Sequence, residues 1–184
     1  TADAAGLTPD IAFIEVDARA PEVTPGSLGA ELTPTSSALE RGTSYGGCMT
    51  DAREPKVALI TGVGRRRSIG AALALGLARD GWDLALNYCT PYDDKVGLER
   101  SADDPRAVAH LCRELGASVE LVEGDLSDPS APGAIVDEAR KLGPLTALVL
   151  SHAESVDSSI LTTDLDSWDR HFAVNARATW LLIK

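Results

Sequence analysis

The sequence of 184 residues lacks several features that define whole classes of protein. No apolar run approaches the roughly 18–20 residues that a membrane-spanning helix needs. The three cysteines are odd in number, lie far apart and form no CxxC pair, which predicts neither a disulfide framework nor a zinc cluster. The first residues also lack the basic and apolar regions of a secretory signal. Together these absences predict a cytoplasmic protein with reduced thiols, no membrane span and no metal site.

Positive charge is scarce as well. The chain has 17 basic against 28 acidic residues, which gives a net charge of −11. A surface this acidic disfavours nucleic acid or an anionic membrane as the main partner. Hydrophobic residues at 44% and charged residues at 24% lie close to the averages of globular proteins, which excludes a fully disordered or collagen-like chain. The length fits one domain, with or without an appendage.

Residues 1–48 differ in composition from the rest. They contain four prolines, many Gly, Ser and Thr, and one short apolar stretch, 11–16, with no partner strand nearby. We therefore expect an irregular segment here, because a lone strand buries too little surface to fold. A flexible extension, a remnant of an upstream domain and translated sequence ahead of the true start are all compatible with this composition.

Both ends of the chain suggest that it is a piece of a longer protein. Met49, the only methionine, directly precedes the first strong strand signal and is a candidate natural start. At the other end, the apolar helical pattern of Trp180–Lys184 continues without a helix stop. We therefore predict a nucleotide-binding domain over residues 49–184 that is truncated at its C-terminus.

From residue 56, strand and helix signals alternate. Short apolar runs typical of buried parallel strands are followed by amphipathic stretches with N-terminal caps and glycine stops. The predicted strands cover residues 57–60, 83–88, 118–122 and 145–150, and the predicted helices begin near 69, 104, 128 and 163 or 164. This alternation predicts an α/β protein with an incomplete Rossmann-like, doubly wound parallel sheet of four strands in the order 3-2-1-4.

Two local predictions accompany this fold. The segment between the second strand and the helix at 104 carries Pro91 and several aspartates, and it is expected to be a polar loop. The first helix is expected to bury the face that carries Ile69, Ala72, Leu73, Leu75 and Leu77. Ligands of such sheets bind beyond the carboxyl ends of the strands, so the site is expected just after Ile60, Tyr88, Val122 and Leu150.

The turn after the first strand reads Thr61-Gly-Val-Gly-Arg-Arg-Arg-Ser-Ile-Gly70. Glycines between a strand and a helix let the backbone approach a pyrophosphate, which lies at the helix N-terminus. Gly62 and Gly64 permit a tight turn, and Gly70 permits close packing of the helix. Ser68 can cap the helix or donate to a phosphate. A tight turn alone would not require three consecutive arginines, so the pattern favours phosphate binding.

These residues resemble the short-chain dehydrogenase/reductase family, whose first turn reads TGxxxGxG. The longer turn here, with Ser68 in place of the middle glycine, is similar to the TGxxxxxSIA turn of the enoyl-acyl-carrier-protein reductase branch. The resemblance continues in Gly124-Asp-Leu126 and in Ser151-His-Ala-Glu154, which stands where the family has Asn-Asn-Ala-Gly and matches it only at Ala153. Phe172–Arg177 fits the helix that carries the family's asparagine. The match covers about residues 56–184.

The resemblance implies an oxidoreductase that transfers hydride between a nicotinamide dinucleotide and a small carbonyl or alcohol substrate, as a homo-oligomer when the protein is complete. It implies that Asp125 holds the adenine and that Asn175 is the structural and catalytic asparagine. From the residues and the resemblance together, the predicted cofactor contacts are Thr61, Gly62, Gly64, Arg65, Arg67, Ser68, Ile69, Gly70, Asp125, Leu126, Ser151, His152 and Ala153.

One family element is missing from these residues. The catalytic serine and the Tyr-x-x-x-Lys pair of the family lie downstream of the asparagine helix, and no tyrosine of this chain is followed four residues later by a lysine. The tyrosine transfers the proton in this chemistry. This chain alone is therefore expected to be inactive. A non-catalytic dinucleotide-binding regulatory or interaction module on the same fold is the alternative, because fold alone does not decide function.

The end of the second strand predicts NADP(H) in preference to NAD(H). NAD enzymes place an acid there to bind the free 2′-hydroxyl, whereas this chain has no acid between the strand and Asp93. The guanidinium groups of Arg65–Arg67 suit phosphate oxygens, and Arg67 matches a position where NADP-dependent members of the family often carry a base. Alternatively these arginines are solvated or pair with Asp93 and Asp94, in which case NAD remains possible.

The last predicted helix carries three aromatic residues at helical spacing. Trp168, Phe172 and Trp180 are expected to lie in the core or in an interface. The acids at the start of the same helix are expected to stabilise its N-terminus rather than to bind a metal.

Overall fold

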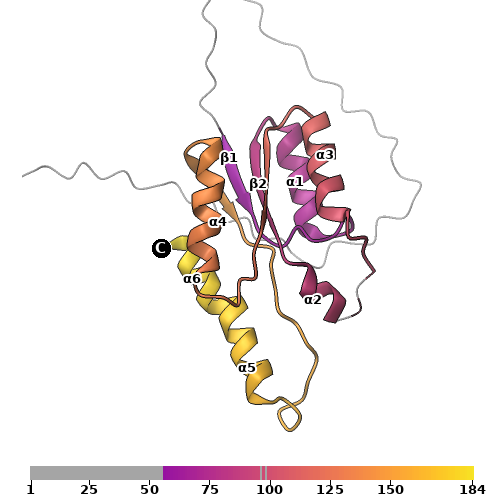
Figure 1. Ribbon diagram of the computed structural model, residues 1–184, viewed down its shortest axis with the longest axis vertical. Helices are drawn as coiled ribbons and strands as arrows, with labels where there is room; N and C mark the ends of the chain where they lie inside the picture. The colour runs from indigo at the N-terminus through magenta and orange to yellow at the C-terminus, as the bar shows by residue number, and fades with distance from the viewer. Residues whose placement is uncertain (1–55, 96, 98) are drawn as a thin grey trace, which may run out of the picture. The chain divides into compact units, whose positions relative to one another are not determined.

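A computed structural model describes residues 56–184 except 96 and 98 (Figure 1). The predictions for residues 1–48, including the apolar stretch 11–16 and Cys48, lie outside the described residues, and so does the candidate start at Met49. The domain boundary at residue 49 stays a prediction.

Strands and helices alternate along the described chain, as predicted. The strands are β1 (Val57–Ile60), β2 (Asp83–Tyr88), β3 (Val119–Glu123) and β4 (Leu145–Val149). The helices are α1 (Ile69–Arg79), α2 (Thr90–Lys95), α3 (Asp104–Glu114), α4 (Ala131–Ala139), α5 (Leu165–Phe172) and α6 (Thr179–Ile183). A 3-10 turn, η1 (Arg140–Leu142), follows α4, and a π-helical segment, η2 (Ala173–Ala178), joins α5 to α6.

The four strands form one parallel sheet in the order β3-β2-β1-β4, which confirms the predicted order. β1 is buried along its whole length because it pairs with β2 on one side and β4 on the other. Its uninterrupted apolar sequence is what a strand covered on both faces requires.

Helices cover both faces of the sheet (Figure 1). Successive residues of a strand point to opposite faces. Ala58 and Ile60 pack in one core cluster with residues of α1 and α3, whereas Leu59 packs in a second cluster with residues of α4 and α6. The doubly wound architecture is therefore confirmed.

The predicted buried face of α1 was wrong in part: Leu75 and Leu77 are partly buried and pack against the core as predicted, but other residues of that face do not. Ile69 is 66% exposed, and Ala72 is also exposed. The buried positions are instead Ala71, Ala74 and Ala78, at helical spacing, together with Gly70. Small side chains on this face let α1 approach the sheet and α3 closely, so the alanines are fully buried and Leu75 and Leu77 only partly.

Two segments also differ locally from the predictions. The expected polar loop after β2 contains the short helix α2. The helix expected near residue 128 begins at Ala131, because the carboxylate of Asp128 accepts hydrogen bonds from the backbone N–H and hydroxyl of Ser130 and forms a turn there.

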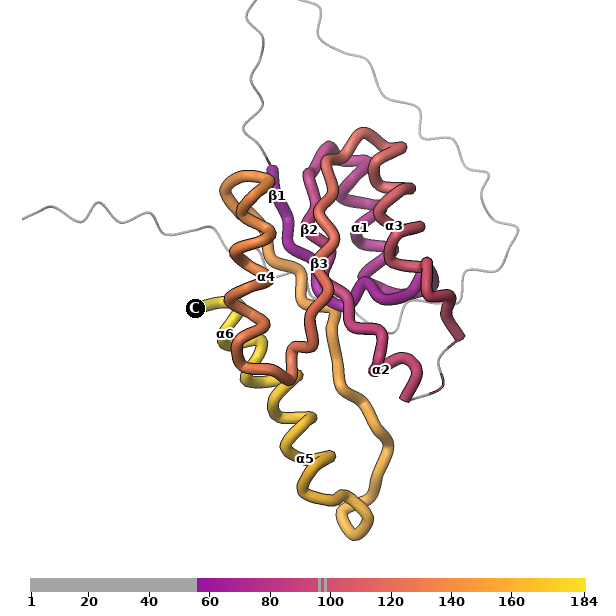
Figure 2. The backbone as a smooth tube through the Cα atoms, in the orientation of Figure 1, coloured from indigo at the N-terminus to yellow at the C-terminus, as the bar shows by residue number. Residues whose placement is uncertain are grey.

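The helix after β4 begins where predicted, with Asp164 as its N-cap accepting from the N–H of Ser167 at 2.7 Å. The chain reaches it through a long connection from the sheet to the far end of α5 (Figure 2). Helices α5 and α6 both carry large apolar side chains that are exposed, here called the apolar stripe: Leu165, Trp168, Phe172, Trp180 and Ile183. The aromatic residues are therefore not in the core, and the expectation of an interface remains.

Within residues 56–184, apart from 96 and 98, no helix combines the length and apolarity needed to cross a bilayer. In the same described part of the chain, no three His, Cys, Asp or Glu side chains gather as a metal site would require.

Candidate functional site

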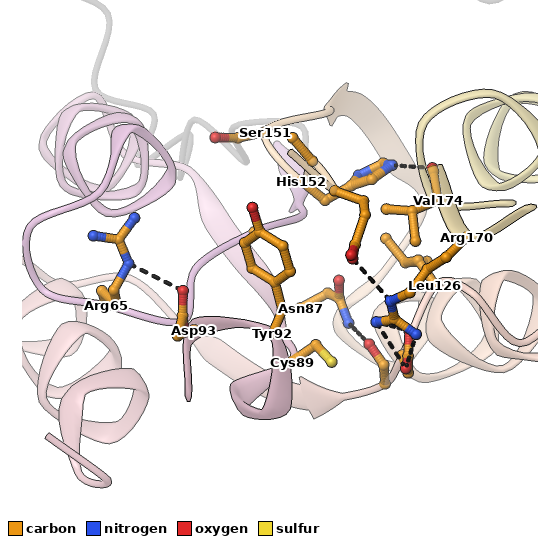
Figure 3. A pocket seen from close by; sticks show the side chains of 16 residues that line it. Arg65, Asn87, Cys89, Tyr92, Asp93, Leu126, Ser151, His152, Arg170 and Val174 are labelled. Atoms are coloured by element: carbon orange, nitrogen blue, oxygen red, sulfur yellow. Dashed lines mark hydrogen bonds and ion pairs between the residues drawn. The ribbon is translucent and has the colours of Figure 1, made fainter. Parts of the chain in front are cut away.

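A cavity of about 230 Å³ lies at the edge of the sheet where the parallel strands end, which is where the site was expected (Figure 3). Residues that follow each of the four strands contribute to it. Its lining residues are Gly62, Gly64, Arg65, Asn87, Cys89, Tyr92, Asp93, Gly124, Asp125, Leu126, Ser151, His152, Ala153, Glu154, Arg170 and Val174.

The structure brings some of the predicted site residues to this cavity and places others around it. Those that line it are Gly62, Gly64, Arg65, Asp125, Leu126, Ser151, His152 and Ala153. Those outside the lining are Thr61, Arg67, Ser68, Ile69, Gly70 and Asn175.

Gly62 lies where three parts of the backbone meet. Its φ is +77°, and a Cβ on it would lie 2.4 Å from the carbonyl oxygen of Ser151 in the β4–α5 connection. A Cβ on Gly70, in the first turn of α1, would lie 2.8 Å from the carbonyl oxygen of Gly62. The turn therefore packs backbone against backbone on both sides, which only glycine permits at these two positions.

Ser68 forms the N-cap of α1. Its Oγ accepts from the N–H of Ala71 at 3.1 Å and donates to the carbonyl oxygen of Arg65 at 2.9 Å. This hydroxyl thus closes the glycine turn onto the helix and leaves the partial positive charge of the α1 N-terminus at the turn.

The alternative prediction, that the arginines of the turn pair with Asp93 and Asp94, holds for one of them. The Nε of Arg65 donates to Asp93 at 3.1 Å, because helix α2 turns that carboxylate back against Gly64. Asp94 pairs with Arg100, whereas Arg66 and Arg67 have exposed side chains. Burial raises the pKa of Asp93 against the lowering effect of Arg65 and Arg100.

His152 is held between the glycine turn and η2. Its Nε2 lies 3.1 Å from the carbonyl oxygen of Val174, which can only accept, so Nε2 carries the proton and donates. Its Nδ1 then accepts from the hydroxyl of Thr61 at 2.7 Å. Burial lowers the pKa of His152, although the Val174 carbonyl raises it in part, and the neutral form that this network needs is therefore favoured.

This network predicts a specific loss of stability in acid. Because the native pKa of His152 is lowered, the unfolded chain takes up the proton first as the pH falls through about 6.5, and the free energy of unfolding decreases. His152→Asn removes the titration and is expected to reduce the loss measured by urea unfolding between about pH 7.5 and about pH 5.5. An equal loss in both proteins would contradict this role of His152.

Asn175 lies in η2 and clamps the β4–α5 connection. Its Oδ1 accepts from the backbone N–H of Glu154, and its Nδ2 donates to the carbonyl oxygen of the same residue, each at 2.9 Å. The backbone carbonyl of Asn175 accepts from the hydroxyl of Thr179 at 3.0 Å. π-Helical segments inside α-helices are frequent at functional sites because they redirect backbone groups.

Sequence reasoning missed an ionic cluster on the wall of the cavity. The Glu154 side chain is 2% exposed and binds Arg170 and Lys95 at 2.8 and 3.2 Å. The guanidinium of Arg170 also reaches Asp125 at 3.3 Å. In Figure 3 the Arg170 cluster and the Arg65–Asp93 pair lie on opposite sides of the cavity. The only sequence signal was the acid that replaces the glycine of the family motif.

Two further lining residues went unnoticed in the sequence. Asn87 is 2% exposed and donates from Nδ2 to the carbonyl oxygens of Val122 and Gly124, each at 3.2 Å, which fixes the end of β3 against β2. The hydroxyl of Tyr92 in α2 accepts from the N–H of Ser155 at 3.1 Å, which joins α2 to the β4–α5 connection.

Comparisons with known proteins identify the family of the chain. Residues 62–184 match the family model described as Enoyl-(Acyl carrier protein) reductase. The chain is 34% identical over 130 residues to the short-chain dehydrogenase/reductase eriH of Hericium erinaceus, which covers 70% of this chain and 48% of that protein. It is 31% identical to the uncharacterized oxidoreductase YghA of Escherichia coli, over 86% of this chain and 49% of that protein.

Solved structures give the same result. A short-chain dehydrogenase/reductase of Serratia marcescens is 30% identical, with a TM-score of 0.60 over 70% of this chain and 48% of that one. A blue fluorescent protein from a metagenomic library, solved in complex with NADPH, is 29% identical, with a TM-score of 0.59 over 70% and 46% of the two chains. The chain spans about half the length of the curated relatives that it matches. From the family model and these relatives, the chain belongs to the short-chain dehydrogenase/reductase family.

Proposed function

We propose that this chain is the cofactor-binding part of an oxidoreductase that transfers hydride between NADP(H) and a carbonyl or alcohol substrate. The observation that carries the proposal is the turn at Gly62, where backbone packs on backbone beside the cavity and the N-terminus of α1. Glycine at Gly62 and Gly70 permits this close packing, and the partial positive charge of the α1 N-terminus would hold a pyrophosphate at the turn. When bound, the nicotinamide supplies the hydride.

The residues present fit a dinucleotide along the strand ends. The glycine turn and the α1 N-terminus would hold the pyrophosphate, and residues at the end of β2 would lie beside the adenosine ribose. Asp125 and Leu126, at the end of β3, would hold the adenine. His152 and Ser151 would lie against the cofactor from the β4 side, next to the turn.

NADP(H) is favoured over NAD(H) by the charges at the turn. The carboxylate of Asp93 would repel a 2′-phosphate, but its ion pair with Arg65 offsets that negative charge. Arg67 is exposed and remains a candidate phosphate ligand. The NADPH complex of the 29% identical blue fluorescent protein supports the same choice.

Binding of the two reduced cofactors to this chain tests the proposal. NADPH should bind roughly ten- to a hundredfold tighter than NADH, because one charge-assisted contact to phosphate contributes ~1.5–3 kcal/mol. Arg67→Ala should remove most of this preference, as measured by titration calorimetry. Arg79→Ala, at the other end of α1, is the matched control and should preserve it. Equal or tighter binding of NADH by the unchanged chain would contradict the choice of NADP(H).

We further propose that Asn175 serves the catalytic site of the complete protein. Its clamp on the Glu154 backbone and its place in η2 support a role in fixing the backbone beside the nicotinamide. The proton donor must come from outside these residues, because no Tyr-x-x-x-Lys occurs in the chain. This chain alone would therefore bind the cofactor without turnover.

We also propose that the complete protein acts in the cytoplasm as a homo-oligomer. The apolar stripe along α5 and α6 supports assembly through this face. Its five large side chains are 48–79% exposed, and large exposed apolar side chains gathered on two successive helices are typical of interaction sites.

A further inference from the structure

Helix α2 is held at the cavity mainly by polar contacts. Within α2, which the structure describes in full, Asp93 alone is buried, and the helix makes few contacts with the other described helices and strands. In Figure 3 the ring of Tyr92 is drawn between the Arg65–Asp93 pair and the Arg170 cluster. Because α2 buries so little apolar surface, it can detach at a smaller cost in free energy than a helix packed into the core.

Two of these contacts join α2 to the β4–α5 connection. The hydroxyl of Tyr92 accepts from the N–H of Ser155 at 3.1 Å and donates to the carbonyl oxygen of the same residue at 3.4 Å. The Nζ of Lys95 donates to Glu154 Oε1 at 3.2 Å. Since β1 lies between β2 and β4 in the sheet, a bridge from the segment after β2 to the segment after β4 crosses the end of β1, where the glycine turn begins.

A third contact places a carboxylate at the glycine turn. Asp93 Oδ1 accepts from the Nε of Arg65 at 3.1 Å, and Asp93 Oδ2 lies 2.7 Å from the position that a Cβ on Gly64 would take. Given the proposed function, an anionic group of the chain itself therefore stands where the turn would meet a phosphate of the cofactor. Carboxylates and phosphates bind the same face of a guanidinium and repel each other, so the two compete for Arg65.

The cavity bounded by α2 is also small for a dinucleotide. Its volume is about 230 Å³, whereas pockets for drug-sized ligands measure roughly 300–1,000 Å³. Tyr92 and Asp93 form part of its wall, so a displacement of α2 would enlarge it. A dinucleotide that binds along the strand ends would therefore have to displace α2 from its present position.

We propose that α2 is an autoinhibitory strap, which covers the cofactor cavity and has to open before NADP(H) enters. The inference rests on the proposed function and adds a control of access to the same site. In the closed position Asp93 occupies Arg65, while Tyr92 and Lys95 bind the helix to the β4–α5 connection. A cofactor phosphate that replaces Asp93 at Arg65 removes one of the three contacts and favours the open position. The apparent affinity is reduced by the fraction of chains that are open, so a looser strap gives tighter binding.

Tyr92→Phe tests the strap, because it removes only the hydroxyl that bonds to Ser155. NADPH should bind about two- to tenfold tighter to this variant, as the loss of one neutral hydrogen bond in the closed position implies. Stopped-flow measurements of NADPH fluorescence should assign the gain to faster association, with the dissociation rate unchanged, because the strap is already open in the complex. A residue with a merely structural role would weaken binding or leave it unchanged.

Hydrogen exchange without nucleotide tests whether α2 opens as one unit. Lys95 bonds to Glu154 and not to Ser155, yet Lys95→Met should speed exchange of the Ser155 amide by about two- to fivefold, as loss of a partly exposed ion pair implies. Lys141→Met is the matched control. It breaks an exposed lysine–glutamate pair in η1, before β4, and should leave both the exchange at Ser155 and the affinity for NADPH unchanged.

The two measurements separate this inference from the proposed function. Unchanged association and dissociation rates in Tyr92→Phe would overturn the inference alone. Faster dissociation from Tyr92→Phe, without faster association, would also overturn it, because α2 would then retain the bound nucleotide instead of excluding it. Unchanged exchange at Ser155 in Lys95→Met would show that α2 does not open as a strap. If neither the unchanged chain nor Tyr92→Phe binds NADPH, the proposed function is contradicted, and this inference with it.

Discussion

Gly62→Ala is expected to lower the free energy of unfolding by about 3 kcal/mol or more, because a side chain at positive φ costs about 1–2 kcal/mol and overpacking adds about 1–3 kcal/mol. The φ of Gly62 is +77°, and the new Cβ would lie 2.4 Å from the carbonyl oxygen of Ser151. That atom belongs to the backbone of the β4–α5 connection and cannot rotate away. Urea unfolding followed by circular dichroism measures the change.

The matched control is Gly76→Ala in the same βα unit. A Cβ on Gly76, within α1, would meet nothing within 4 Å. Alanine should therefore stabilise the chain by about 0.5–1 kcal/mol through helix propensity and reduced freedom of the unfolded state. If the two variants had similar urea midpoints, the close approach of the turn to the β4–α5 connection would not contribute to stability. In any Gly62→Ala protein that folds, NADPH affinity should also fall, because relief of the clash with Ser151 displaces the turn that would hold the pyrophosphate.

Arg170→Met is expected to destabilise the chain by about 2–4 kcal/mol. Breaking a buried ion pair by removing one partner typically costs about 3–5 kcal/mol, because the remaining charge stays buried. Here Lys95 still contacts Glu154, which reduces the loss, but its side chain is half exposed. Thermal or urea unfolding of the chain measures the effect.

A double-mutant cycle assigns the loss to the buried charge. Adding Glu154→Gln to Arg170→Met should recover a large part of the stability, since the unpaired carboxylate is then replaced by a neutral amide of the same shape. Arg106→Met, which breaks an exposed pair with Asp103, should change stability little. Additive losses in the double variant would show that Arg170 acts through packing and not through its charge.

Much of the fold was predictable because the signals are local. The apolar run of β1 and the glycine turn that follows it are contiguous in sequence, and alternation of strands and helices prescribes a parallel sheet with right-handed crossovers. These signals predicted the strand order 3-2-1-4 and the carboxyl ends of the strands as the place where the cavity lies. Ser68 as the cap of α1 followed from the same kind of local pattern.

Predictions from the local sequence pattern were wrong where packing between helices and strands determines the structure. In α1 the alanines are fully buried whereas Leu75 and Leu77 are only partly buried, and how deeply each position is buried depends on how closely the helix approaches its neighbours. The short helix α2 was read as a loop because Pro91 and its aspartates favour irregular structure in isolation, whereas its tyrosine and lysine contacts with the β4–α5 connection exist only in the folded chain.

The sequence by itself determined the family, the sheet and the glycine turn after β1, because each is encoded in a few neighbouring residues. Only the tertiary structure determined which acidic and basic side chains form ion pairs. Arg65 and Asp93 are 28 residues apart in sequence, Glu154 and Arg170 are 16 apart, and Asp125 and Arg170 are 45 apart. No sequence rule selects these partners among 28 acids and 17 bases. The choice follows from the parallel strands, which bring the segments after β2, β3 and β4 to one edge, where burial makes pairing of each carboxylate necessary.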